Sequence, residues 1–210
     1  MGITIEVAPS DLRTNLVHLA WYLPIALAIG IVQLVFLSQP PWWDAVLLSL
    51  SGVSVDDMAI GVGAGLVLLL TGTVVKVLTR GGDAVWTYKA LAAIEPGHRN
   101  IWSMASFAAI LEETLFRAAV VPLIGLVPAA VLFAAAHFGT LLMAPTRGDA
   151  ARAFVDILFF GLLIGWLFEA VGLVACIVAH LVHNVVALYH ARVPWRRFHD
   201  DWVAARASSL

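Results

Sequence analysis

Residues 58–78 read MAIGVGAGLVLLLTGTVVKVL, an apolar run with a single charge, Lys76, near its end. A helix needs about 20 mostly apolar residues to cross a bilayer, so this run predicts a membrane span. The whole chain agrees: 61% of its 210 residues are hydrophobic and 12% are charged, and its mean hydropathy is +0.93. This composition excludes an ordinary soluble domain, and the sequence has no basic patch for binding nucleic acid.

The same criterion predicts six spans, over residues 16–37, 58–78, 101–120, 121–143, 153–170 and 173–191. The fourth span begins with helix-breaking residues, which predict a loop followed by a helix from residue 127 or 128. Residues 42–50 are too short to span and predict an interfacial helix. We therefore expect an all-α, polytopic transmembrane bundle that forms one domain over residues 1–210.

The basic residues predict the orientation of this bundle. Of the 12 Lys and Arg residues, all except Arg117 fall on one side of a six-span topology, and Arg117 lies within the third span. The opposite side receives Asp44, Asp56 and Asp57 and no basic residue. By the positive-inside rule, both termini are expected in the cytoplasm.

Ionisable side chains inside a membrane are costly, which makes them functional candidates. Residues 111–117 of the third span read LEETLFR. Adjacent residues point about 100° apart on a helix, so Glu112 and Glu113 cannot share one role. Glu113 and Arg117 are four apart in the favourable order and are predicted to pair. Either these groups form a structural ion-pair network, or Glu113 and Arg117 are scaffold and Glu112 is a catalytic base.

Histidines occur in two further spans. The fourth contains His137, which could serve only as a hydrogen bond between helices. The sixth reads HLVHN over residues 180–184. His180 and Asn184 share one helical face, so both could donate to a single oxygen, as an oxyanion hole requires. His183 lies off that face and either lines the same cavity or bonds a neighbouring helix.

Two chemistries suit this set of side chains. In the first, Glu112 and His137 deprotonate a water that attacks a peptide carbonyl, while His180 and Asn184 stabilise the oxyanion. In the second, His137, His180 and a glutamate hold a zinc ion that activates the water. The common HExxH motif is absent from the sequence. We expect a site without a cofactor, with zinc as the alternative.

Three motifs in order, EExxxR at residues 112–117, FxxxH at 133–137 and HxxxN at 180–184, resemble those of the CPBP family. This family, also called Abi, contains type II CAAX prenyl proteases and bacteriocin-processing enzymes. The resemblance covers residues 101–191, the expected catalytic core. It implies an intramembrane glutamate endopeptidase whose helices surround a central cavity.

By this resemblance Glu112 and His137 activate water, and His180 and Asn184 stabilise the oxyanion. The supporting positions are Glu113, Arg117 and Phe133.

The resemblance also implies a membrane-associated protein or peptide as substrate, within the lipid bilayer. The compact chain favours relatives that remove C-terminal anchor segments, and its Ala/Val/Trp-rich composition favours a bacterial plasma membrane. Two alternatives stay open. One is a catalytically silent family member acting as a bacteriocin-immunity or binding protein, and the other is a membrane transporter, which can also use buried carboxylates and histidines.

Overall fold

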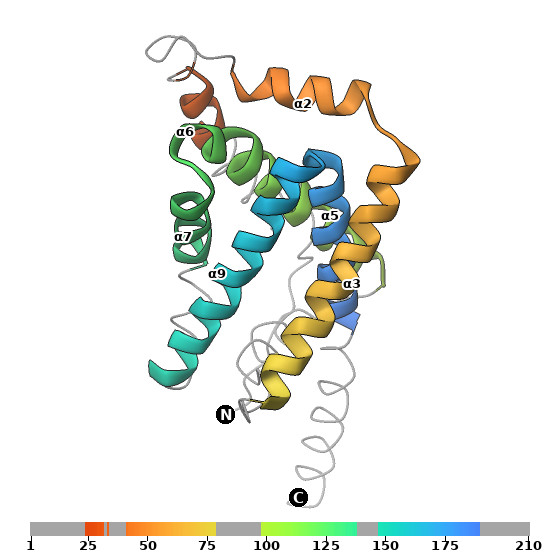
Figure 1. The fold of residues 1–210 in the computed structure, drawn as a ribbon, viewed down its shortest axis with the longest axis vertical. Coiled ribbons are helices and arrows are strands. Elements are labelled where there is room, and N and C mark those ends of the chain that lie inside the picture. Colours follow the sequence, from red (N-terminus) through yellow and green to blue (C-terminus); the bar gives the residue numbers. More distant parts are fainter. Residues whose placement is uncertain (1–23, 32, 34–40, 79–97, 138–146, 190–210) are drawn as a thin grey trace, which may run out of the picture.

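The computed structural model describes residues 24–31, 33, 41–78, 98–137 and 147–189. All the regular structure in these ranges is helical, which confirms the all-α prediction (Figure 1). The labelled elements are α2 (Trp42–Ser51), α3 (Val55–Leu78), α5 (His98–Glu113), the π-helix η1 (Thr114–Val120), α6 (Val121–Ile124), α7 (Leu126–Ala136) and α9 (Arg147–Ala170). Two further helices, called here helix 24–31 and helix 173–189, cover those residues.

Two of these helices are long and apolar enough to cross a membrane. They contain the windows Val55–Gly72 in α3 and Ala150–Ala170 in α9, while Leu126–Ala136 and Leu173–Tyr189 are apolar but shorter. Parts of the predicted first and fourth spans lie outside the described residues. The six-span count, the central cavity and the cytoplasmic termini therefore stay predictions.

A capping box forms at the start of α3, at the end of the bundle near α2. The backbone N–H of Asp57 donates to Ser54 Oγ at 3.0 Å, and the Ser54 N–H donates to Asp57 Oδ2 at 3.3 Å. These reciprocal bonds satisfy backbone donors where α3 begins. The chain turns there, and α2 runs across the end of the bundle at a steep angle to α3 (Figure 1). A short helix over residues 42–50 was predicted, and α2 confirms it.

The structure differs from the sequence prediction in two elements. The third span is not one regular helix, because α5 ends at Glu113 and the chain continues as η1. The fourth span is broken at Gly125, as expected, but α7 begins at Leu126, earlier than predicted. Gly125 has φ 83°, a conformation that side chains disfavour, and Pro128 fits in the first helical turn, where its missing N–H does no harm.

Glycines let α3 approach helix 173–189 closely. A Cβ added at Gly61 would lie 2.7 Å from the carbonyl oxygen of Ala175, and one at Gly65 would lie 2.6 Å from that of Ala179. These distances are too short for any side chain, so the two backbones meet directly, as in small-xxx-small packing of membrane helices. The contact fixes helix 173–189, which carries the third motif, against α3.

A second close contact joins α7 to α9, which lie side by side in Figure 1. A Cβ added at Gly161 would lie 3.2 Å from the Phe133 ring, and one at Gly165 would lie 2.9 Å from Leu126 Cδ1. The ring of Phe133 also meets Phe116 of η1 edge to face, with centroids 5.1 Å apart. These contacts bring the second motif, on α7, to the first motif.

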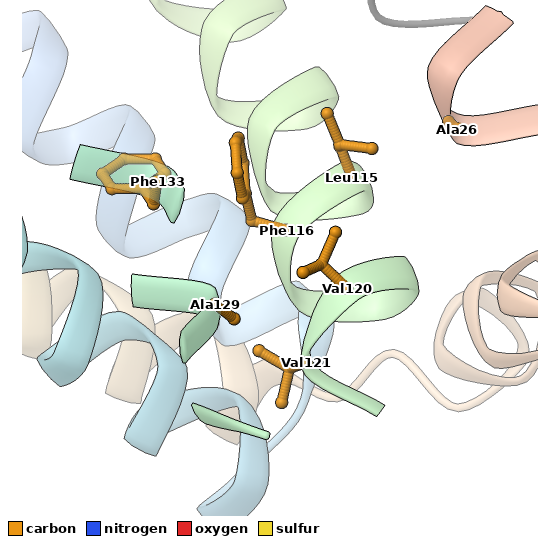
Figure 2. Packing of buried hydrophobic residues seen from close by; sticks show 7 residues of the cluster. All are labelled: Ala26, Leu115, Phe116, Val120, Val121, Ala129 and Phe133. Atoms are coloured by element: carbon orange, nitrogen blue, oxygen red, sulfur yellow. The ribbon is translucent and has the colours of Figure 1, made fainter. Parts of the chain in front are cut away.

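The core around η1 is apolar and draws on four helices. Figure 2 shows Phe116 beside Phe133, with Val120 and Val121 near Ala129. Ala26 of helix 24–31 belongs to the same cluster. The π-helix is thus packed between helix 24–31 and α7. All of its residues except the first, Thr114, are buried.

Candidate active site

The first motif spans the junction of α5 and η1. Glu112 and Glu113 close α5, and Arg117 lies in the π-helix that follows. At the end of η1 the backbone N–H of Val121 bonds to the carbonyl of Phe116, five residues back. Short π-helical segments inside α-helices occur frequently at functional sites.

Arg117 is 1% exposed and is held by three groups. Its Nε lies 3.0 Å from Glu113 Oε2, so the ion pair expected from the four-residue spacing is present. Its Nη2 donates to the carbonyl oxygen of Gly161 at 3.3 Å, and its Cζ lies 4.5 Å from the centre of the Phe133 ring. The guanidinium therefore links the first motif to α7 and α9.

Glu113 also binds the third motif, a contact that the sequence did not indicate. His180 Nδ1 lies 2.6 Å from Glu113 Oε1, and both residues are buried. A carboxylate paired with a guanidinium is an acceptor, so Nδ1 donates its hydrogen to Glu113. This bond fixes the orientation of the imidazole and turns Nε2 toward Glu112.

His137 is oriented in the same manner by the backbone. It follows the last residue of α7, and its Nδ1 lies 2.8 Å from the carbonyl oxygen of Phe133. A carbonyl only accepts, so Nδ1 carries the hydrogen and Nε2 is left to face the site. His137 Nε2 lies 3.7 Å from Glu112 Oε2, and His180 Nε2 lies 4.0 Å from the same oxygen.

Glu112 is placed differently from Glu113. Its Oε2 atom is buried and has no hydrogen-bond partner in the part of the chain that the structure describes. Both imidazoles approach this oxygen at distances longer than a direct hydrogen bond. Glu113 Oε2 also lacks a hydrogen bond among the described residues, but it lies 3.0 Å from Arg117 Nε in an ion pair, whereas the nearest ionisable partner of Glu112 Oε2 there is 3.7 Å away.

Aromatic rings surround the imidazoles. The ring centres of Phe133 and His137 are 4.6 Å apart, and Phe160 of α9 lies 5.0 Å from His180 and 4.9 Å from His183. The sequence analysis missed Phe160, which offers no signal within an apolar span. It also missed the backbone carbonyl of Gly161, because any residue carries such a group.

Asn184 lies one helical turn beyond His180 and is half-buried. Its Oδ1 atom is 3.4 Å from His183 Nδ1. In the described residues no hydrogen bond joins Asn184 to Glu112, His137 or His180. Glu112, Glu113, Arg117, His137 and His180 therefore lie close together, whereas the contact found for Asn184 is with His183.

A comparison with protein families matches residues 98–186 to the model of the type II CAAX prenyl endopeptidase Rce1-like family. Residues 98–186, called the Rce1-like segment below, are similar to this family. The match begins at the start of α5 and includes all three motifs, which confirms the family that the motifs resemble. No curated protein and no solved structure matches the chain.

The Rce1-like segment together with the two long apolar helices indicates an integral membrane protein. The matched residues nearly coincide with the predicted catalytic core over residues 101–191, and the role of each site residue stays a prediction.

A zinc site would need at least three ligating side chains close together. Among the described residues, no group of three or more His, Cys, Asp or Glu side chains is arranged to hold a metal ion. His137 Nε2 and His180 Nε2 lie 3.7 and 4.0 Å from Glu112 Oε2. Because the described residues show no such group, no step below is routed through a metal.

Proposed function

We propose that the protein is an intramembrane endopeptidase of the glutamate type, which hydrolyses a peptide bond of a membrane-associated protein or peptide. One observation carries this proposal. The buried Oε2 atom of Glu112 has no hydrogen-bond partner among the described residues, and two imidazole Nε2 atoms face it. The endopeptidase family that residues 98–186 match supports the same reaction.

The hydrogen bonds of the two histidines suit activation of a water. Their Nδ1 hydrogens are committed to Phe133 and Glu113, so Nε2 of each neutral ring is an acceptor. A water could bridge the Glu112 oxygen and His137 Nε2, whose separation of 3.7 Å is longer than a direct bond. Glu112 takes one proton as the water oxygen attacks the carbonyl carbon, and the carbonyl π electrons move to its oxygen.

The resulting oxyanion needs hydrogen-bond donors. The side-chain amide of Asn184 is a donor in its ordinary state. His180 can donate through Nε2 only when both of its ring nitrogens carry a hydrogen, because the Nδ1 hydrogen is directed at Glu113. Collapse of the tetrahedral intermediate breaks the C–N bond, and the proton held by Glu112 passes to the leaving amine.

The proposal also includes a class of substrate and a location in the cell. We infer a membrane-associated peptide, with a C-terminal anchor segment as the first class to test, because the proposed site lies on apolar helices. The bundle would sit in a bacterial plasma membrane with both termini in the cytoplasm.

The test compares two glutamate-to-glutamine variants of the purified protein in liposomes containing anchor peptides. Glu112→Gln should lower the cleavage rate by about 100-fold or more, since it removes a general base. Glu169→Gln is the matched control, because Glu169 is exposed near the end of α9. Equal cleavage by the wild type and Glu112→Gln would contradict the proposal. A folded wild type that binds anchor peptides without cleaving them would favour the silent binding protein.

A further inference from the structure

Gln33 is a buried polar residue far from the matched family segment in sequence. It is 1% exposed and, like residues 24–31, it is helical. Its Nε2 donates to the carbonyl oxygen of Ala119 at 3.2 Å, and its Oε1 accepts the backbone N–H of Trp42 at 3.0 Å. One amide group therefore joins the N-terminal region, the start of α2 and the π-helix η1.

The surroundings of Gln33 reinforce this connection. The indole Nε1 of Trp42 donates to the carbonyl oxygen of Ala26 at 2.6 Å, which ties α2 back to helix 24–31. Ala26 also packs in the apolar cluster with Leu115 and Phe116 (Figure 2). Inside such a cluster an unpaired amide would be costly, so both ends of the Gln33 side chain favour this one arrangement.

Ala119 lies two residues beyond Arg117, in the same π-helix. A return of η1 to ordinary α-helical hydrogen bonding would rotate its residues relative to α5. Arg117 would then lose its place between Glu113 and the carbonyl of Gly161. Because Glu113 orients His180 through a hydrogen bond, a shift in η1 would also change the orientation of the imidazole.

We propose that Gln33 is a positioning residue, which holds η1 in its π-helical form and thereby holds the Glu113–Arg117 pair and the His180 ring in place for catalysis. The effect on catalysis rests on the proposed peptidase function, whereas the effect on η1 does not. Gln33 acts through the Ala119 carbonyl and takes no part in the chemistry.

The test uses Gln33→Met, which keeps the length of the side chain and removes its hydrogen bonds. Trp42→Phe is the matched control, because it removes the indole bond to Ala26 and leaves the Gln33 amide and the Trp42 backbone N–H in place. Hydrogen exchange of peptides covering residues 114–120 reports the state of η1 without any substrate. Anchor-peptide cleavage, measured well below the unfolding temperature, gives kcat and KM separately.

Gln33→Met should speed exchange in η1 and lower kcat by about 10- to 100-fold with little change in KM, since small misplacements of reacting groups have effects of this size. Trp42→Phe should leave η1 exchange near the wild-type rate. Unchanged exchange in η1, or a kcat loss no larger than the loss of folded protein, would overturn the proposal. If the wild type cleaves nothing, the peptidase function fails, and the exchange rates still decide whether Gln33 holds η1.

Discussion

The carboxylate of Glu113 serves two partners at once. One oxygen lies 3.0 Å from Arg117 Nε and the other 2.6 Å from His180 Nδ1. Both partners are almost fully buried, so neither can turn to solvent if the carboxylate is lost. Glu113 therefore stabilises the fold and the orientation of an imidazole through the same two contacts.

Glu113→Gln should lower the free energy of unfolding by about 3–5 kcal/mol, because breaking a buried ion pair leaves an uncompensated charge on Arg117. Thermal unfolding followed by circular dichroism measures the loss. Glu112→Gln provides the contrast, since Oε2 of Glu112 has no hydrogen-bond partner to lose among the described residues. A larger stability loss for Glu112→Gln would show that the two roles are reversed.

Asn184→Ala should lower kcat by about 100- to 1000-fold with little change in KM, because an oxyanion donor acts mainly in the transition state. His183→Ala should be milder, since the His183 ring packs against Phe160 and lies off the proposed donor face. Both variants are compared in the anchor-peptide assay. A dead His183→Ala beside an active Asn184→Ala would move the oxyanion role to His183.

At the scale of elements, local rules predicted some features from sequence and missed others. The spacing of Glu113 and Arg117 predicted their ion pair, and Gly125 predicted the break before α7. The π-helix was not predicted, because its hydrogen-bond register depends on packing between helix 24–31 and α7 and has no residue pattern of its own.

Contacts between segments far apart in the chain also could not be predicted from the sequence. Glu113 and His180 are separated by 67 positions, and Gln33 and Ala119 by 86. Helical periodicity shows which face a side chain occupies, but not which neighbouring helix that face meets. The three motifs could be linked in advance through their chemistry and the family resemblance, but not through these contacts.

Gly65→Ala should destabilise the fold by about 1–3 kcal/mol, because the new methyl group would lie 2.6 Å from the Ala179 carbonyl oxygen and force the helices apart. Gly63→Ala is the matched control in the same helix, since an added Cβ there meets nothing within 4 Å. It should be neutral or stabilising by up to about 1 kcal/mol. Thermal unfolding checks both variants, and equal melting temperatures would contradict the packing argument.

The whole molecule is expected to follow the positive-inside rule, with α2 on the side opposite to the termini. Asp44 lies in α2, and Asp56 and Asp57 lie in the first turn of α3. The described residues 41–58 contain no Lys or Arg. The steep angle between α2 and α3 suits a helix that lies along the membrane surface (Figure 1).

Reporter fusions after Ser54 and after Leu210 should therefore score on opposite sides of the membrane. The excess of Lys and Arg on the predicted cytoplasmic side is the physical reason, because such loops resist translocation. A paired fusion to alkaline phosphatase and to a fluorescent protein reads each side independently. Signals from the same side would contradict the six-span topology.

The bond from Arg117 to α9 ends on a main-chain oxygen, at Gly161. Any amino acid supplies that oxygen, so this contact places no demand on the side chains of α9 beyond a small residue at position 161, where Phe133 lies close. The bonds of Glu113, in contrast, require particular side chains on η1 and on helix 173–189. In chimaeras assembled from homologous chains, α9 should therefore be exchangeable on its own as long as Gly161, Gly165 and Phe160 are kept, whereas the segment 112–117 and helix 173–189 should be exchangeable only together.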